Sequence, residues 1–416
     1  MGSQGIVSMI KILEPKAIRP LRLAYVTDQF LTGETTDTIQ IVSMASGFGW
    51  HGVDTTIVLP MKSDLPTAPR IAKHYGVEPD FEVLPLKGPY PAPFGFRGLE
   101  KLAFAHASAR RVHTTRIFDA TYTRNLPVVL AMLAETRQPV FYETYRPWPE
   151  LDRKKALLFK MLARESRLFG IVVNSQQLVD GYLKAGFRAD RILVAHNGVD
   201  PRRFAAPMHR DDARAKLGLP KKGTLAVYVG QIGPGKGPDL VLDAAARLVD
   251  VSFAMVGSMG MGPIERRAAA LPNVKLVPWQ PPSEVSTWLM AADILIVPPT
   301  ASPLEPMSSM LPQKTYQYLA SGRAIIGPDT PALREVLTDG YDARLVAPDS
   351  LELFVRELTA LTRDPGLRAA LGNRARASAL TRTWEDRAGR VLDFMVSRGI
   401  AAAAQHRQAQ RGPRPA

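Results

Sequence analysis

The chain of 416 residues contains no cysteine, which excludes disulfide bonds, thiolate metal sites and cysteine nucleophiles. It also lacks long apolar runs near its front. The longest of these, residues 126–134, is far shorter than the ~20 residues that a membrane-spanning helix needs. The N-terminus has neither the charged-then-apolar pattern of a signal peptide nor the Ser or Thr at position six that favours myristoylation. These absences predict a cytoplasmic protein, and they leave peripheral membrane association open.

Acidic residues are fewer than basic ones, 39 against 53, which gives a formal net charge of +14. Such a balance favours an anionic partner, such as a nucleotide sugar, an acidic lipid surface or nucleic acid. Nucleic acid is the least favoured partner, because the chain has no recognised binding module and no interleaving of aromatic and basic residues. The seven histidines show no metal-ligand spacing, so no metal site is predicted.

Residues 222–327 organise the rest of the chain. An apolar strand is expected over residues 225–229, followed by a glycine-rich turn from Gly230 and a helix from Pro238. In that arrangement, free backbone N–H groups and the positive end of the helix dipole point at one place. Lys236 adds a positive charge beside the turn. We therefore predict a seat for the phosphates of a nucleotide, with a tight turn that binds no ligand as the alternative.

The same turn also satisfies part of the P-loop pattern, because Gly230 is followed by four residues and then by Gly235 and Lys236. A P-loop needs Ser or Thr at the next position to hold magnesium, and here that residue is Gly237. No long apolar strand ending in Asp or Glu supplies the partner carboxylate. A P-loop nucleotide hydrolase is therefore disfavoured.

Strand-like and helical segments alternate along the chain, which predicts α/β architecture with doubly wound parallel sheets. Ligands bind such sheets at the carboxyl ends of the strands, which here include the loop over residues 28–37 with Gly33. The length allows two domains. We expect a mobile N-terminus at residues 1–19, a first domain at 20–200, a linker at 201–222, a second domain at 223–383, a helix returning to the first domain at 384–399, and a disordered basic tail at 400–416.

Residues 151–169 predict a basic amphipathic helix. At 100° per residue, one face is apolar and the opposite face is basic; the apolar positions are Leu151, Leu158, Leu162 and Phe169, and the basic ones are Arg153, Lys160, Arg164 and Arg167. Such a helix can lie on anionic lipid. The alternative is an ordinary helix that packs on a sheet and exposes its polar face to solvent.

Several stretches together resemble the second half of a GT-B glycosyltransferase of the large retaining family 4, in that family's order and near its spacing. They include YVGQIGPGKGPDLVLDAAARL, NVKLVPWQPPSEVSTWLMAADILIVPP and PQKTYQYLASGRAIIG, and the resemblance extends over residues 170–395. It implies two Rossmann-like domains facing an interdomain cleft. It also implies transfer of a hexose-type sugar from a nucleotide-diphosphate donor to a saccharide or lipid-linked acceptor, with retention of configuration, in surface polysaccharide or glycoconjugate biosynthesis. The chain contains no Asp-x-Asp, which argues against the metal-dependent transferase fold.

The resemblance also assigns catalytic positions. The family stabilises the leaving nucleotide diphosphate with an Arg and a Lys, which correspond here to Gln231 and Lys236. The missing charge could be replaced by Lys314 or Arg323. The family histidine that contacts the donor sugar corresponds to Tyr145. No metal or cofactor is implied, because the donor phosphate itself helps to deprotonate the acceptor.

Further residues of the donor and acceptor sites follow from the same resemblance. Two family glutamates, eight positions apart, correspond to Ser309 and Gln317, with Glu305 as an alternative to Ser309; glutamine binds a ribose diol less strongly than a carboxylate does. The remaining donor positions are Gly230, Gly257, Pro278, Trp279, Met310 and Leu311, and those on the acceptor side are Gly33, Arg124 and Glu143. The alternative for Arg124, Glu143 and Tyr145 is that they lie at ordinary strand ends and have no role in binding or catalysis. A catalytically degenerate sugar-binding or scaffold protein is the alternative for the whole chain.

Overall fold

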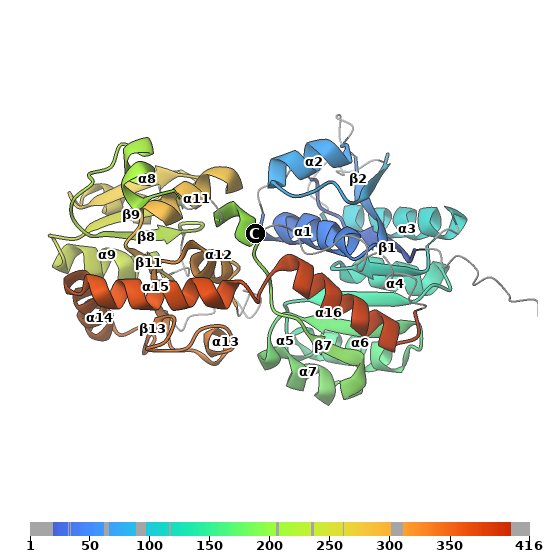
Figure 1. The fold of residues 1–416 in the computed structure, drawn as a ribbon. Coiled ribbons are helices and arrows are strands. Elements are labelled where there is room, and N and C mark those ends of the chain that lie inside the picture. Colours follow the sequence, from blue (N-terminus) through green and yellow to red (C-terminus); the bar gives the residue numbers. More distant parts are fainter. Residues whose placement is uncertain are drawn as a thin grey trace, which may run out of the picture.

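The computed structural model describes residues 20–31, 33, 35–61, 66–88, 97–115, 118–204, 208–233, 237–260, 262–300 and 311–400. In this part of the chain the strands form two parallel sheets, one of seven strands and one of six. Each sheet has helices on both faces, and the two units lie side by side (Figure 1). The predicted fold class, two doubly wound α/β domains, is confirmed.

The first domain contains the seven-stranded sheet, in the order β3-β2-β1-β4-β5-β6-β7. Its strands are β1 (Arg22–Val26), β2 (Asp54–Pro60), β3 (Glu82–Leu86), β4 (Ala120–Thr123), β5 (Val140–Thr144), β6 (Leu168–Val173) and β7 (Ile192–Val194). Its helices are α1 (Thr36–Trp50), α2 (Ala68–Tyr75), α3 (Arg97–Thr115), α4 (Leu126–Glu135), α5 (Trp148–Leu151), α6 (Arg153–Arg164) and α7 (Val179–Lys184), with short 3₁₀ turns η1 (Gln176–Leu178) and η2 (Ala189–Arg191).

The second domain contains the six-stranded sheet, in the order β10-β9-β8-β11-β12-β13. Its strands are β8 (Leu225–Val229), β9 (Ser252–Ser258), β10 (Val274–Pro278), β11 (Ile294–Ile296), β12 (Ala324–Pro328) and β13 (Arg344–Val346). Its helices are α8 (Arg210–Lys216), α9 (Pro238–Arg247), α10 (Pro263–Ala269), α11 (Pro282–Ala291), α12 (Lys314–Ser321), α13 (Pro331–Arg334), α14 (Leu351–Arg363) and α15 (Pro365–Ala379). The 3₁₀ turn η3 (Pro201–Phe204) precedes this domain.

Helix α16 (Trp384–Ser397) returns to the first domain after α15 (Figure 1). It packs closely on α1, where a Cβ built on Gly47 would lie 2.9 Å from the Cβ of Ala388. The chain passes between the domains twice, and the two connecting segments lie beside each other. The backbone N–H of Val199 donates to the carbonyl of Arg382, and the backbone N–H of Trp384 donates to the carbonyl of Val199. The last helix therefore joins both domains at one hinge.

Different helices pack on the two faces of the first sheet. The core that contains Tyr25 of β1 also contains residues of α1, α2 and α16. The core that contains Ala24, the preceding residue, contains residues of α3, α4, α6 and α7. This alternation follows from the two-residue period of a strand. Within the described residues, no helix combines the length and the apolar character that crossing a membrane requires.

Two expectations differ from what the structure contains. Residues 201–222, expected to form a linker, include α8, which is built into the second domain because buried Arg214 pairs with Asp293 and donates to the carbonyl of Ala291. The helix expected over residues 151–169 ends at Arg164, and Phe169 lies in β6. The carboxylate of Glu165 accepts from the N–H of Arg167, which forms a local turn in place of another helical turn.

Candidate functional site

The carboxyl ends of β8 and β9 meet at two glycines with left-handed backbone. Gly230 has φ +147° and Gly257 has φ +123°, and a Cβ on Gly257 would lie 2.3 Å from the carbonyl oxygen of Gly230. Both positions therefore require glycine. At the far end of the turn, Gly237 (φ +74°) precedes α9, whose N-terminus begins at Pro238. Lys236 falls outside the described residues.

Lys314 begins α12, and its ammonium lies beside this turn. Its Nζ is 4.1 Å from the ring centroid of Tyr228, and a Cβ on Gly230 would lie 2.6 Å from the same Nζ. The Tyr228 hydroxyl donates to the carbonyl of Gln231 at 2.8 Å, and burial raises the pKa of Tyr228, which keeps it protonated as a donor. The Gln231 side chain is exposed. Arg323, the other proposed substitute, follows α12 at its opposite end and donates to the Met290 carbonyl.

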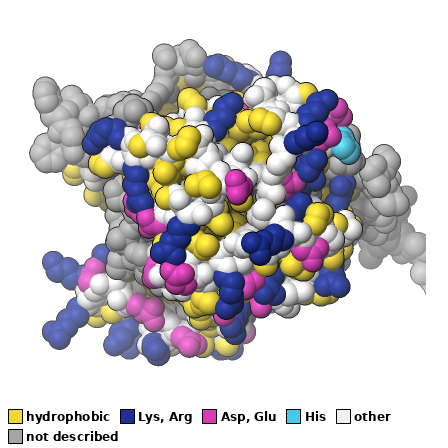
Figure 2. Space-filling view, turned by 90° about the vertical axis from the view of Figure 1, so that its left-hand side faces the viewer, with side chains coloured by type: hydrophobic (Ala, Val, Ile, Leu, Met, Phe, Trp, Pro, Cys, Tyr) yellow, Lys and Arg dark blue, Asp and Glu magenta, His cyan; other side chains and the backbone are white. Residues whose placement is uncertain are grey.

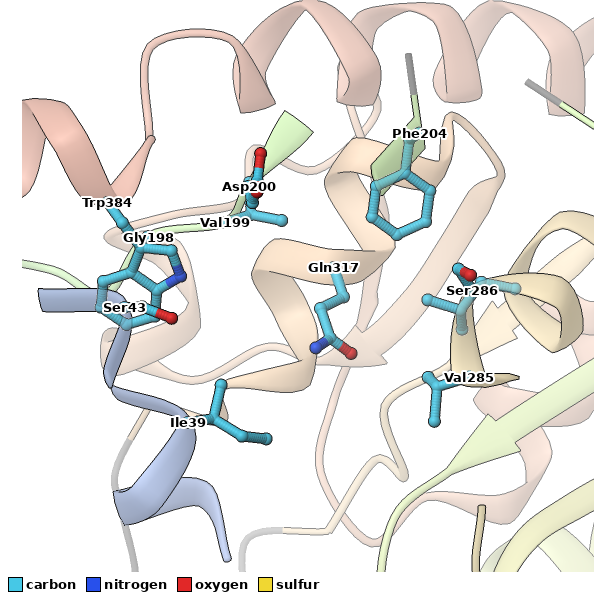
Figure 3. Close-up of a pocket in the computed structure, with 11 residues that line it drawn as sticks. Ile39, Ser43, Gly198, Val199, Asp200, Phe204, Val285, Ser286, Gln317 and Trp384 are labelled. Atoms are coloured by element: carbon cyan, nitrogen blue, oxygen red, sulfur yellow. The ribbon is translucent and has the colours of Figure 1, made fainter. Parts of the chain in front are cut away.

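Gln317 lies one turn further along α12 and points into a small cavity between the domains (Figure 3). Ile39 and Ser43 of α1 line one side of the cavity, and α11 lines another. The side chain of Gln313 donates to the Gly198 carbonyl at 3.0 Å, which holds the start of α12 against the hinge. Helix α12 therefore carries Lys314 toward β8 and Gln317 toward the interdomain cavity.

Of the other residues predicted to bind the donor, some lie near Gly257 and others do not. Trp279 follows β10, and its backbone N–H donates to the carbonyl of Ser258, the residue after Gly257, at 2.9 Å. Pro278 is exposed. Leu311 is fully buried just before α12. Ser309, Met310 and Glu305 lie outside the described residues. The structure thus brings the ends of β8, β9 and β10 and the start of α12 together.

Glu143, predicted on the acceptor side, is only 1% exposed at the end of β5. Its carboxylate accepts from Arg387 of α16 at 2.8 Å and from the side chains of Gln40 and Tyr122. Burial alone would raise the pKa of Glu143, but the charges of Arg387 and Arg124 outweigh it and hold the pKa below its usual range. These contacts point to a structural role that connects β5, α1 and α16.

Arg124 and Tyr145 lie together at the carboxyl ends of β4 and β5. Arg124 pairs with Asp37 of α1 at 3.0 Å, and its guanidinium lies 5.4 Å from the Tyr145 ring. Arg146 lies at the same distance from this ring and 5.2 Å from the ring of Trp148. These residues form a basic and aromatic edge, part of which is solvent-accessible. Gly33 lies in a tight turn nearby, where its carbonyl accepts from Thr38 and Tyr75.

The sequence analysis did not single out a contact between the domains. Glu335, directly after α13, accepts from the Ser175 hydroxyl at 2.8 Å, the Gln176 N–H at 2.8 Å and His196 at 2.7 Å. Burial would raise the pKa of Glu335, but these hydrogen bonds lower it. No local sequence pattern signals this contact, because its partners are 139 to 160 positions away.

Residues 209–378 match the model of the family described as "Glycosyl transferases group 1". The D-inositol 3-phosphate glycosyltransferase of Streptomyces bingchenggensis is 27% identical over 241 residues, which cover 54% of this chain and 51% of that protein. That of Frankia alni is 31% identical over 220 residues, covering 49% and 52%. The chain spans about half the length of the curated relatives that it matches.

Solved structures resemble both domains. Anabaena Alr3699/HepE, in complex with UDP and glucose, aligns over 91% of this chain and all of that one, with a TM-score of 0.71 and 16% identity. Sucrose-phosphate synthase from Thermosynechococcus elongatus aligns over 91% and 98%, with a TM-score of 0.73 and 15% identity. Residues 209–378 are therefore similar to the group 1 glycosyltransferases, and the whole chain has the GT-B fold.

Proposed function

We propose that this protein is a retaining glycosyltransferase that moves a hexose-type sugar from a nucleotide-diphosphate donor to a saccharide or lipid-linked acceptor. The role that fits this reaction is synthesis of a surface polysaccharide or glycoconjugate. A lipid-linked acceptor would bring the protein to the inner face of the cell membrane, with contact through residues 151–169. The observation that supports the proposal is the close contact of Gly230 with Gly257, together with the start of α9 and the ammonium of Lys314 beside Gly230.

In the proposed reaction, negative charge grows on the leaving nucleotide diphosphate. Backbone N–H groups at the start of α9 and the positive charges of Lys236 and Lys314 would stabilise that charge. The family resemblance assigns contacts with the nucleoside to Trp279 and Gln317, and Tyr145 directly follows β5 in the first domain. Neither a protein nucleophile nor a metal is needed if the donor phosphate takes the proton from the acceptor hydroxyl.

A thermal-shift panel with UDP, GDP, ADP and dTDP sugars tests this proposal. A ligand that binds only the folded state raises the unfolding temperature, so a shift with one donor would identify the nucleotide. We expect Lys236→Ala to lose that shift and to lower turnover at least about tenfold, as for loss of a transition-state donor. The exposed Lys222→Ala is the control. Unchanged turnover in Lys236→Ala would contradict this assignment.

Lys314→Met should weaken binding of the nucleoside diphosphate at least about tenfold, because a charge-assisted contact is lost. Binding of the corresponding nucleoside should stay unchanged, since it lacks the phosphates, and Lys314→Arg should recover most of the affinity. Isothermal titration calorimetry measures all three. Equal weakening for nucleoside and diphosphate would indicate a disturbed pocket and would rule out a specific phosphate contact.

A catalytically degenerate sugar-binding or scaffold protein is the second candidate, and Gln231 and Gln317 favour it because both replace charged family residues. The two candidates differ in one measurable property. Slow hydrolysis of the donor, or transfer to any acceptor, excludes the degenerate protein. Donor binding without either reaction excludes the transferase.

A further inference from the structure

Tyr228, near the end of β8, presents its ring to the ammonium of Lys314. The distance of 4.1 Å from Nζ to the ring centroid is well within the ~6 Å over which an aromatic face attracts a cation. Tyr228 is only 1% exposed and packs among Leu242 and Met255. Its hydroxyl donates to the Gln231 carbonyl at 2.8 Å. The ring is therefore fixed in the core, and the flexible side chain of Lys314 is the partner that it can restrain.

Gly230 leaves the space that the ammonium occupies. A Cβ at this position would lie 2.6 Å from Nζ and 3.2 Å from Cε of Lys314, and 3.1 Å from the Tyr228 hydroxyl. Any side chain at residue 230 would displace the lysine from the ring. The ammonium thus lies directly beside the backbone, at the point where β8 ends and the glycine-rich turn begins.

Helix α12 is itself fixed against the strands below it. Lys314 and Tyr318 are four positions apart and therefore lie on the same face of this helix. The Tyr318 hydroxyl accepts from the Val229 N–H at 3.0 Å and donates to the Ile296 carbonyl at 3.3 Å. These bonds hold the helix on the ends of β8 and β11. The side chain of Lys314 therefore starts from a fixed helix and ends on a fixed ring.

Tyr228 is a neutral partner for this cation. Burial raises the pKa of Tyr228, so the ring attracts the ammonium without adding a negative charge. On the outer end of the second domain, by contrast, Lys and Arg side chains lie among Asp and Glu side chains (Figure 2). Arg267, for example, pairs with Asp239 and Asp243. A carboxylate cancels much of the positive charge of its partner, whereas a neutral ring leaves that charge to act on an anion.

We propose that Tyr228 is a positioning residue, which holds the Lys314 ammonium beside Gly230 so that its charge can act on the phosphates of the donor. This inference rests on the proposed function and adds a residue that acts through Lys314. A lysine side chain has several rotatable bonds, and ordering it on binding costs conformational entropy. The ring orders the ammonium before the donor arrives, which reduces that cost.

Nuclear magnetic resonance of the full chain with ¹³Cε-labelled lysine tests the contact directly. Protons above an aromatic ring are shielded, so we expect the Hε protons of Lys314 upfield of the other lysine signals. Lys314→Met identifies this signal by removing it. Tyr228→Phe should keep the upfield shift, and Tyr228→Leu should abolish it. A wild-type spectrum without such a signal overturns the inference, whether or not Tyr228→Leu folds.

Isothermal titration calorimetry with inorganic pyrophosphate tests the consequence for phosphate binding. Tyr228→Leu should weaken binding about fivefold, the scale of one cation–π contact, and Tyr228→Phe should stay within about twofold because the ring remains. In the Lys314→Met background, Tyr228→Leu should have no further effect, since the ring then has no ammonium to hold. An equal loss in that background would mean that the ring shapes the turn and does not act through Lys314.

Phe253→Leu is the matched control for loss of a buried ring. Phe253 is also 1% exposed, but it lies near the start of β9, at the opposite end of that strand from Gly257. This variant should leave pyrophosphate binding and the Lys314 signal unchanged, and weakening equal to that of Tyr228→Leu would overturn the inference. Wild-type protein that binds a donor sugar, with pyrophosphate binding that does not depend on Tyr228, overturns this inference alone. Wild-type protein that binds neither compound overturns the proposed function as well.

Discussion

Arg387→Ala is expected to lower the free energy of unfolding by about 3–5 kcal/mol, because it removes the cation that is hydrogen-bonded to a buried carboxylate. Arg387 and Glu143 are 2% and 1% exposed, and their ion pair spans 2.8 Å. Arg124 is too distant to replace the lost hydrogen bond, since its nearest nitrogen is 3.8 Å from the Glu143 carboxylate. A urea titration followed by circular dichroism measures the loss.

Two comparisons separate the ion pair from general damage to α16. Arg390→Ala, on the same helix but exposed, removes one hydrogen bond to the Val194 carbonyl and should cost about 1 kcal/mol. The double variant Arg387→Met with Glu143→Met should be more stable than Arg387→Ala alone, because neither charge then remains buried. A double variant as unstable as the single one would contradict this interpretation.

The pH dependence of the Arg387→Ala effect follows from the lowered pKa of Glu143. A carboxylate with a lower pKa in the folded state stabilises the fold above its unfolded pKa, and that contribution is lost as the pH falls through the folded pKa. The difference in stability between wild type and Arg387→Ala should therefore be largest near neutral pH and shrink in acid. A difference that grows in acid would contradict the charge assignment.

The fold was predictable because its signals are local. Alternating apolar strands and helices, and a glycine turn after residues 225–229, indicate doubly wound sheets without knowledge of any distant contact. Gly257 was assigned to the same site as Gly230 through the family resemblance, and the carboxyl ends of parallel strands do share one edge of the sheet. The structure places them in contact, because a Cβ added to Gly257 would lie only 2.3 Å from the carbonyl oxygen of Gly230.

The features that could not be predicted are contacts between side chains that are far apart in the sequence. Glu143 and Arg387 are 244 positions apart, and nothing in either segment signals the pair. Lys314 was one of two candidates to replace the missing arginine, and the choice between it and Arg323 needed the docking of α12. Extending one helical period through residues 165–169 also concealed the end of α6 at Arg164.

Gly257→Ala should destabilise the second domain by about 3 kcal/mol, from left-handed backbone strain and a clash with a rigid group. The new Cβ would meet the Gly230 carbonyl oxygen at 2.3 Å, and a backbone atom cannot rotate away as a side chain can. The most direct relief is separation of the ends of β8 and β9, which would break the bond from the Gly230 N–H to Val256. The proposed nucleotide site would then lose its shape as well as its stability.

Gly260→Ala provides the control for this prediction, because no heavy atom lies within 4 Å of the added Cβ and the position is only three residues away. It should change stability by less than about 1 kcal/mol and leave nucleotide binding intact. Thermal unfolding with and without the stabilising donor measures both effects. If Gly257→Ala keeps the wild-type nucleotide shift, contact between the two strand ends is not what shapes the seat. Binding would then depend on the start of α9 and on Lys314, and not on the junction of β8 and β9.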